Sequence, residues 1–275
     1  MSIQTVLIVH GAWYSGATWG PVVEALVERG HRAVALDRPG TGLQARYPAS
    51  YLARDQVALR SERSPVAGMG IDELAEATAA QVRRFAGHGP VVLVGHSFGG
   101  QIITRTAEQV PELIRRLVYV AAYCPVRLGS AAAYNALPEN RISLSETMQI
   151  GDPATTGAVR VDPRDTDPAR RELGRQAFFN DVPTPLYEAV SAYLMPDHPL
   201  QSALDDARGT LARWGRIPRR YVRCSLDKAI PIALQDRMIA EADEATPDNP
   251  FEVATLPASH SPFLSMPDRL AELLL

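Results

Sequence analysis

Residues 91–100 read VVLVGHSFGG, and this stretch decides the fold. Its first four residues are apolar and three of them are β-branched, which is typical of a short strand buried on both faces at the centre of a parallel sheet. The strand pattern stops at Gly95, and beyond Gly99 the apolar residues recur at helical spacing until Pro111. Ser97 is therefore predicted to lie in the turn between a buried strand and a helix.

The small residues around Ser97 have the Gly-x-Ser-x-Gly spacing of a nucleophile elbow. In such a turn the serine backbone is strained, and the glycines let the strand and the helix approach closely. The hydroxyl then projects at the carboxyl edge of the sheet, near the first N–H groups of the helix. A plain glycine-rich turn could contain the same five residues, but the strand before it and the helix after it favour a nucleophile.

Composition limits the classes of function. The chain has 275 residues, 46% of them hydrophobic and 21% charged, enough for a substantial core. A net charge of −3 gives no reason to expect nucleic acid or an anionic membrane as partner. The two cysteines, Cys124 and Cys224, have no metal-type spacing and suit a reducing compartment. The apolar run at 6–9 lacks the basic flank of a signal peptide, and no stretch approaches the roughly 20 apolar residues of a membrane span. We therefore expect a soluble cytoplasmic protein.

Strand and helix patterns alternate along the chain, which predicts a mostly parallel sheet flanked by helices. Six strands are expected, at 6–9, 33–36, 91–94, 117–121, 220–224 and 251–256. Between residues 125 and 216 the strand-like runs disappear, prolines are frequent, and apolar residues form short helical patches. We expect a core made of residues 1–124 and 217–275, with residues 125–216 inserted as a helical lid after the strand that ends near Tyr123.

Two more chemically suggestive residues follow predicted strands. Asp227 comes after the strand at 220–224, and His260 after the strand at 251–256. The carboxyl ends of parallel strands share one edge, so Ser97, Asp227 and His260 should meet there, in the chain order Ser, Asp, His. His260 could take the proton of the serine hydroxyl, while Asp227 holds its other ring nitrogen. The alternatives are an ordinary turn aspartate and a surface histidine.

The remaining histidines fit a catalytic role less well. His10 is placed to brace a glycine-containing loop, and His96 lies inside the elbow; we expect solvated side chains at His31, His88 and His198. An oxyanion would need two N–H donors, and the elbow supplies that of Phe98. The second is expected from the loop at 10–13, at Ala12.

With these residues placed, the chain resembles the α/β-hydrolase superfamily over nearly its whole length. Within it, the chain is most similar to the branch of plant methylesterases, hydroxynitrile lyases and their bacterial relatives. The likeness rests on VHGA at 9–12, VGHSFGG at 94–100, CSLDKAIP at 224–231 and SHSP at 259–262. The resemblance implies the α/β-hydrolase fold, a triad of Ser97, Asp227 and His260, a covered apolar pocket, and no cofactor or metal.

The chain departs from the lyases of that branch at two places. Those lyases carry a lysine directly after the catalytic histidine and a threonine in the oxyanion loop. Here Ser261 follows His260, and Gly11 and Ala12 occupy the loop. These differences favour ester hydrolysis over cyanohydrin cleavage.

The pocket is expected to have an aromatic wall, although any single lid aromatic could instead pack the lid against the core. The expected lining residues are Trp13, Phe98, Tyr123, Phe178, Phe179, Tyr187, Tyr193 and Leu194. Such a wall suits a small-to-medium hydrophobic carboxylic ester or lactone, a small-molecule substrate cleaved through an acyl-enzyme. Two alternatives stay open: elimination, cyclisation or carbon–carbon cleavage of a polyketide-like substrate at the same site, and a hydrolase-fold binding protein. A homodimer is also left open.

Overall fold

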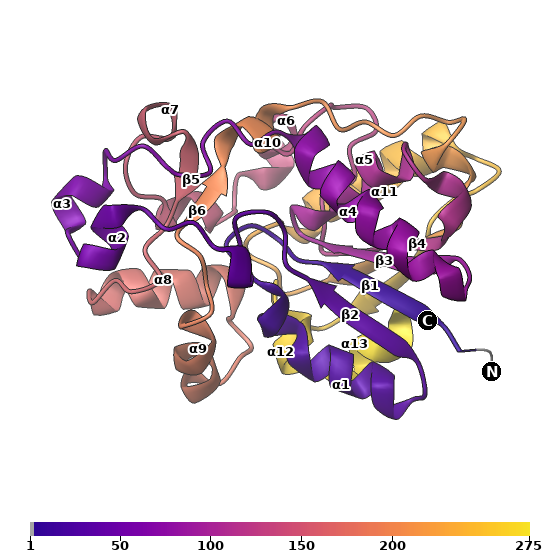
Figure 1. Ribbon diagram of the computed structural model, residues 1–275, viewed down its shortest axis with the longest axis horizontal. Helices are drawn as coiled ribbons and strands as arrows, with labels where there is room; N and C mark the ends of the chain where they lie inside the picture. Colours follow the sequence, from indigo (N-terminus) through magenta and orange to yellow (C-terminus); the bar gives the residue numbers. More distant parts are fainter. Residues whose placement is uncertain (1–2) are drawn as a thin grey trace.

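The computed structural model describes residues 3–275, which form a six-stranded parallel sheet in the order β2-β1-β3-β4-β7-β8 (Figure 1). The strands are β1 (Thr5–Val9), β2 (Arg32–Leu36), β3 (Val91–His96), β4 (Ile114–Val120), β7 (Arg219–Cys224) and β8 (Glu252–Leu256). The predicted parallel sheet of about six strands is confirmed.

The central strands are apolar on both faces because helices cover both. In β3, Leu93 packs into the core on one face of the sheet, while Val92 and Val94 pack into the core on the other. All three are at most 2% exposed. Removing the side chain of a residue as buried as Leu93 costs roughly 2–5 kcal/mol of stability.

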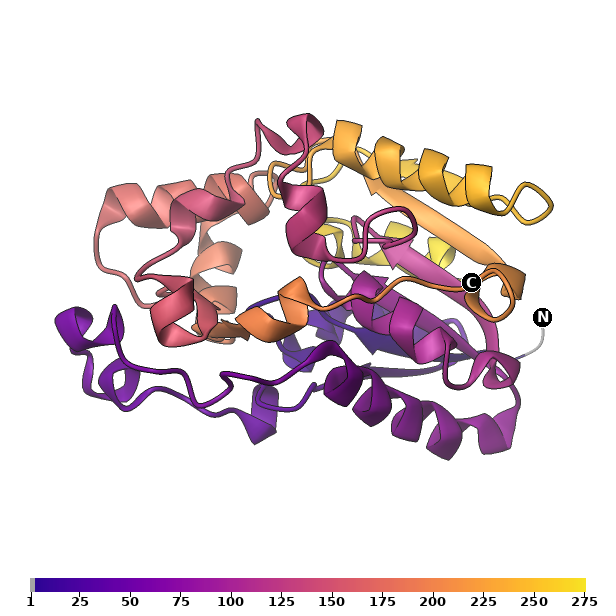
Figure 2. The same ribbon diagram turned by 90° about the horizontal axis from the view of Figure 1, so that it is seen from above.

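Two groups of helices sandwich the sheet (Figures 1 and 2). One face is covered by α1 (Gly20–Glu28), α12 (Pro262–Ser265) and α13 (Pro267–Leu273). The other is covered by α4 (Ile71–Phe85), α5 (Gly99–Ala107) and α11 (Ile232–Ala245). Helix α4 has Asp72 and Glu73 in its first turn and Arg83 and Arg84 in its last turn, and these charges complement the helix dipole. Within residues 3–275 we find no helix both long and apolar enough to span a bilayer.

Most of the segment between β4 and β7 lies beyond one end of the sheet, and its last residues run back along the sheet to the start of β7 (Figure 2). It contains α6 (Ala131–Asn135), α7 (Pro153–Thr156), α8 (Pro168–Phe178), α9 (Thr184–Ser191) and α10 (Leu200–Leu204). The sequence indicated helical patches here, but the segment also holds an antiparallel pair, β5 (Ala158–Arg160) and β6 (Asp197–Pro199). The prediction missed this pair of strands, because a strand of three residues is too short to show a periodic pattern.

Residues 43–70, which lack a sustained period, contribute α2 (Ala49–Ala53) and α3 (Gln56–Leu59). Both helices lie beside β5 and β6, away from the sheet (Figure 1). Arg160 of β5 joins the two regions: its guanidinium pairs with Asp197 at 2.6 Å and donates to the carbonyl oxygens of Leu59 and Glu62. This long connection is therefore fastened to the inserted segment.

Candidate active site

Ser97 lies between β3 and α5 in a left-handed backbone conformation, with φ of 53°. A non-glycine residue adopts this conformation at a cost and mainly where function requires it. The neighbouring glycines make the turn possible: a Cβ on Gly95 would lie 2.7 Å from the carbonyl oxygen of Gly99, and one on Gly99 would collide with that of Val9. The expected close approach of strand and helix is present.

Asp227 and His260 are joined by a hydrogen bond. The Nδ1 of His260 lies 2.7 Å from Oδ2 of Asp227. The other carboxylate oxygen accepts from the backbone N–H groups of Ala229, at 2.7 Å, and Ile230, at 2.9 Å. The loop after β7 therefore fixes the carboxylate, which in turn orients the imidazole.

Ser97 and His260 line the same cavity. Ser97 is 8% exposed, and His260 is 1% exposed. The carbonyl oxygen of His260 accepts a hydrogen bond from Nε2 of His96, at 2.8 Å, and the two rings lie 4.7 Å apart between centroids. Burial, together with the neighbouring His260, lowers the pKa of His96 well below its usual value, so the ring is neutral. His96 therefore holds the loop that carries His260.

The loop after β1 runs directly beside Ser97. A Cβ on Gly11 would lie 2.7 Å from the Cβ of Ser97 and 3.1 Å from its hydroxyl oxygen, so only glycine fits. Ala12 lines the cavity that Ser97 faces, and so does Phe98. Within residues 3–275, the backbone N–H groups of Ala12 and Phe98 have no hydrogen-bond acceptor. Two free donors thus flank the serine, as an oxyanion site requires.

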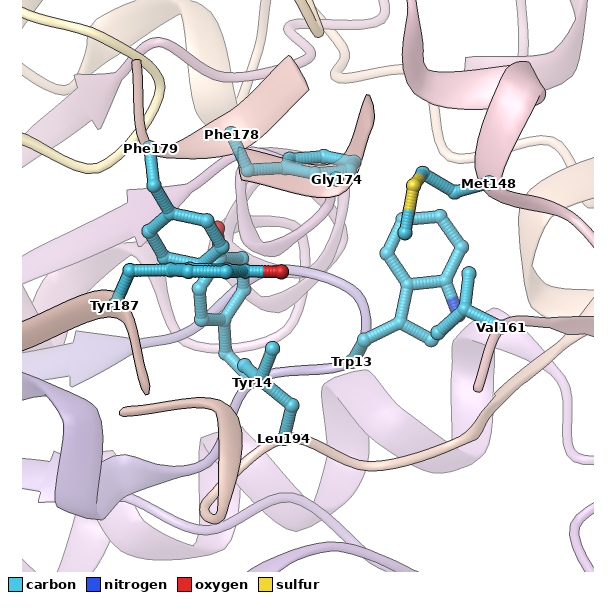
Figure 3. Close-up of a pocket in the computed structure, with 9 residues that line it drawn as sticks. All are labelled: Trp13, Tyr14, Met148, Val161, Gly174, Phe178, Phe179, Tyr187 and Leu194. Atoms are coloured by element: carbon cyan, nitrogen blue, oxygen red, sulfur yellow. The ribbon is translucent and has the colours of Figure 1, made fainter. Parts of the chain in front are cut away.

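Two cavities meet at this end of the sheet. The first, with about 690 Å³ of empty space including its mouth, is lined by Ser97 and His260. The second, of about 370 Å³, is lined by Trp13, Tyr14, Met148, Val161, Gly174, Phe178, Phe179, Tyr187 and Leu194 (Figure 3). Trp13 and Phe178 line both cavities, with their rings edge to face at 5.7 Å. This aromatic pair is the wall between them.

Trp13 also ties the inserted segment to the core. Its backbone has φ of 62°, its indole N–H donates to the carbonyl oxygen of Val159, and its own carbonyl accepts from the N–H of Met195 at 2.6 Å. Both partners belong to the segment between β4 and β7.

The expected lining residues are distributed unevenly. Trp13, Phe98, Tyr123 and Phe178 line the cavity of Ser97, whereas Phe179, Tyr187 and Leu194 line only the aromatic cavity. The prediction that Tyr193 lines the pocket was wrong, because this residue is 54% exposed and lines neither cavity. It ends a turn after α9, where its carbonyl oxygen accepts from the hydroxyl of Ser15.

The prediction of a solvated His198 was wrong. This residue of β6 is 3% exposed, lines the cavity of Ser97, and packs edge to face on Phe98 at 4.0 Å between centroids. Burial lowers its pKa well below the usual value, assisted by the charge of Arg38. Asn135, Ser145 and Gln149 also line this cavity and were not anticipated. All come from irregular or short elements, where no pattern marks which side chains point inward.

The described residues contain no cluster of three or more His, Cys, Asp or Glu side chains arranged to hold a metal ion. Beside the polar side chains just described, the cavity holds the hydroxyl of Ser97, the imidazole of His260 backed by the Asp227 carboxylate, and the free backbone N–H groups of Ala12 and Phe98.

Comparison with known proteins agrees with this geometry. Residues 6–273 match the model of the alpha/beta hydrolase family. The chain belongs to this family. The predicted fold and the resemblance stated from the sequence are both confirmed.

Among curated members, a pyrethroid hydrolase from Sphingobium wenxiniae is 29% identical over 99% of this chain and 86% of that protein. Putative methylesterase 11 of Arabidopsis thaliana is 26% identical over 98% of this chain, which spans only 62% of that protein. A crystal structure of a pyrethroid hydrolase superposes with a TM-score of 0.76 at 24% identity, covering 99% of this chain and 96% of the other. The structure of polyneuridine aldehyde esterase gives 0.73 at 20% identity, covering 99% and 98%.

Proposed function

We propose that this protein is a serine hydrolase that cleaves a small-to-medium hydrophobic carboxylic ester through an acyl-enzyme. One observation carries the proposal: His260, hydrogen-bonded to Asp227, shares a cavity with a serine held in a left-handed conformation beside two free N–H donors. The names of the relatives, a hydrolase and methylesterases, support the same reaction class.

Each residue has a distinct step in the reaction. The Ser97 oxygen attacks the ester carbonyl while Nε2 of His260 takes the hydroxyl proton. Asp227 stabilises the imidazolium that forms, and the N–H groups of Ala12 and Phe98 donate to the oxyanion. The imidazolium then protonates the departing alcohol, which leaves the acyl group on Ser97. A water molecule, deprotonated by His260, releases the acid and restores the serine.

The cavity walls suggest which esters fit. The wall formed by Trp13 and Phe178 favours a hydrophobic group, and the aromatic cavity beyond it offers room for a second one. We propose that residues 125–216 act as a lid, since Trp13 fastens them over the site. The relatives' names make methyl esters and a pyrethroid the first substrates to try.

The residue after His260 supports hydrolysis rather than cyanohydrin cleavage. Ser261 is fully buried, and its hydroxyl lies 2.9 Å from the hydroxyl of Tyr14, so it is turned away from the cavity. Among residues 3–275, no lysine or arginine lines the cavity of Ser97, so none is placed beside the base to hold a cyanide ion.

Fluorophosphonate labelling tests the proposal. We expect intact mass to rise by one adduct on the native protein and to stay unchanged for a folded Ser97→Ala variant. The same pair of proteins is then assayed with methyl, aryl and lactone substrates and with a pyrethroid. Absence of an adduct on the native protein, together with equal turnover by Ser97→Ala, would refute the proposal.

A further inference from the structure

Arg38 is a buried cation in the loop that follows β2. It is 3% exposed, and among residues 3–275 no carboxylate lies within 4.0 Å of its guanidinium. Its neighbour Asp37 points elsewhere and accepts from the N–H groups of Gly16, at 2.8 Å, and Leu43, at 3.3 Å. Burial lowers the pKa of Arg38 to about 9, so the group still carries its charge at neutral pH. The charge of Asp37 acts on Arg38 only from a distance, and a buried charge with no carboxylate in contact is costly, which makes a purely stabilising role a poor explanation.

The contact that Arg38 makes lies directly behind the catalytic cavity. Its Nη2 donates to the carbonyl oxygen of Gly11 at 2.9 Å. The Nε of Arg38 donates to Nδ1 of His10 at 3.4 Å, and that ring nitrogen lies 2.9 Å from the same carbonyl oxygen of Gly11. That carbonyl belongs to the peptide unit whose N–H is the N–H of Ala12. One end of this peptide thus faces a cation, and the other end faces the cavity without an acceptor.

This arrangement has a direct electrostatic consequence. Hydrogen bonds to a peptide oxygen draw electron density through the amide and make its N–H a stronger donor. The charge on the guanidinium adds to this effect and also fixes the plane of the peptide. Phe98, whose N–H is the other donor, has its ring 6.0 Å from the Cζ of Arg38. The cation therefore contacts the Gly11–Ala12 peptide and lies near the Phe98 side chain, but it is not among the residues that line the cavity.

We propose that Arg38 is a positioning residue that aligns and polarises the Gly11–Ala12 peptide, so that the Ala12 N–H stabilises the oxyanion of the reaction. The inference rests on the proposed function, because it assigns a purpose to the charge only if an oxyanion forms beside Ser97. Negative charge develops on the substrate oxygen only on the way to the tetrahedral intermediate. Arg38 therefore acts on kcat and leaves the binding of uncharged esters unchanged.

Two variants of Arg38 separate its charge from its bulk. Arg38→Met removes the charge but keeps an unbranched side chain of similar volume, and replacing a buried charge by such an apolar residue is often neutral for stability, so the variant should fold. Arg38→Lys keeps the charge. The matched control is Arg219→Met: Arg219 is 2% exposed and donates to backbone carbonyls including that of Gly215, but it starts β7 at the opposite end of the sheet from Ser97.

For an aryl ester, we expect Arg38→Met to lower kcat by about 10-fold to 100-fold, less than the ~10²–10³ of deleting a donor outright. KM should change by less than about threefold, since uncharged substrate binds alike. We expect Arg38→Lys to recover at least half of the loss on a logarithmic scale. Arg219→Met should leave kcat within about twofold.

Inhibitor binding distinguishes this role from a merely structural one. The Ser97 oxygen adds to the carbonyl carbon of a trifluoromethyl ketone, and the serine proton passes to His260. The resulting adduct carries an oxyanion, whereas the matching amide binds without forming one. We expect Arg38→Met to lower the affinity for the ketone by the same factor as it lowers kcat, and to leave the affinity for the amide unchanged.

Equal weakening of both inhibitors, or a native-like kcat for Arg38→Met, would overturn the inference while native esterase activity upholds the proposed function. A native protein that neither hydrolyses the ester nor binds the ketone would overturn both. If Arg38→Met fails to fold, the same two inhibitors are compared on Arg38→Lys, where equal weakening of both likewise overturns the inference.

Discussion

The two oxygens of Asp227 have different partners, and this predicts what an amide would do in its place. Oδ1 accepts from two backbone N–H groups, so in Asp227→Asn that position must stay an oxygen. The amide nitrogen then faces Nδ1 of His260 and forces the ring proton onto Nε2, where the serine proton should go. We expect kcat to fall by about 10⁴-fold with little change in fold.

Kinetics with an aryl ester and thermal unfolding together check this prediction. Asp181→Asn is a suitable control, because Asp181 accepts from the backbone N–H of Ser259 beside His260 but makes no contact with the ring. We expect that variant to keep most of its activity. An Asp227→Asn enzyme within tenfold of the native rate would mean that the tautomer is not set by this carboxylate.

Residues that follow a buried strand were predictable, and residues whose burial depends on tertiary packing were not. Ser97, Asp227 and His260 each come just after a strand that the sequence marks clearly, so their meeting at one edge follows from the parallel sheet. His198 and Arg38 are polar residues in segments without periodicity. Their burial depends on the inserted segment and the loop after β2 closing over them, which no local pattern encodes.

The two ring nitrogens of His198 are buried and have no hydrogen-bond partner within residues 3–275. An unsatisfied buried polar group costs about 1–3 kcal/mol, and an apolar residue of similar shape removes that cost. We therefore expect His198→Leu to raise the free energy of unfolding by about 1 kcal/mol. Urea denaturation measures the change. The control is His96→Leu, which loses the hydrogen bond to the carbonyl of His260 and should lower the free energy of unfolding. A lower free energy of unfolding in both variants would show that His198 has a hydrogen-bond partner in the folded protein.

At the scale of elements, length decided what could be predicted. Every sheet strand lies within a few residues of its predicted range. The central strands show in the sequence as continuous apolar runs. The pair β5 and β6 and the helices α2 and α3 have three to five residues each, which is less than two helical turns. Contacts with one another, such as those of Arg160, hold them in place instead.

The wall between the two cavities predicts a change of specificity. Phe178 at the end of α8 faces both cavities, so Phe178→Ala should join them into one space. We expect kcat/KM for an ester with a bicyclic aromatic group to rise about tenfold relative to a methyl ester, which corresponds to about 1.4 kcal/mol of added apolar contact. Phe179→Ala is the matched control, because Phe179 lines only the aromatic cavity.

The ratio of the two kcat/KM values is the quantity to measure, since Phe178 also packs on His260 at 5.5 Å and its loss will lower both rates. An unchanged ratio in Phe178→Ala, or an equal rise in Phe179→Ala, would show that the aromatic cavity does not receive substrate.

At the scale of the whole molecule, three histidines buried as neutral rings link stability to pH. Burial is the main cause that lowers the pKa values of His10, His96 and His198 well below the usual 6.5; the charge of Arg38 adds to it at His10 and His198. An unfolded chain would protonate all three below about pH 6.5, while the folded protein does not. The stability they confer is therefore complete well above pH 6.5 and is lost as the pH falls through and below that value.

Each such histidine contributes a loss of about 1 kcal/mol between pH 6.5 and 5.5, so the three together should lower the free energy of unfolding by about 3 kcal/mol. Urea denaturation at pH 7.5, 6.5 and 5.5 measures this. Between pH 7.5 and 6.5 the free energy of unfolding should fall by only about 1 kcal/mol for the three histidines together, because in the unfolded chain they are half protonated at pH 6.5. His198→Leu should remove about one third of the acid loss, since one proton fewer is taken up on unfolding. An unchanged pH slope in that variant would mean that His198 is protonated in the folded protein, which contradicts a neutral ring buried against Phe98.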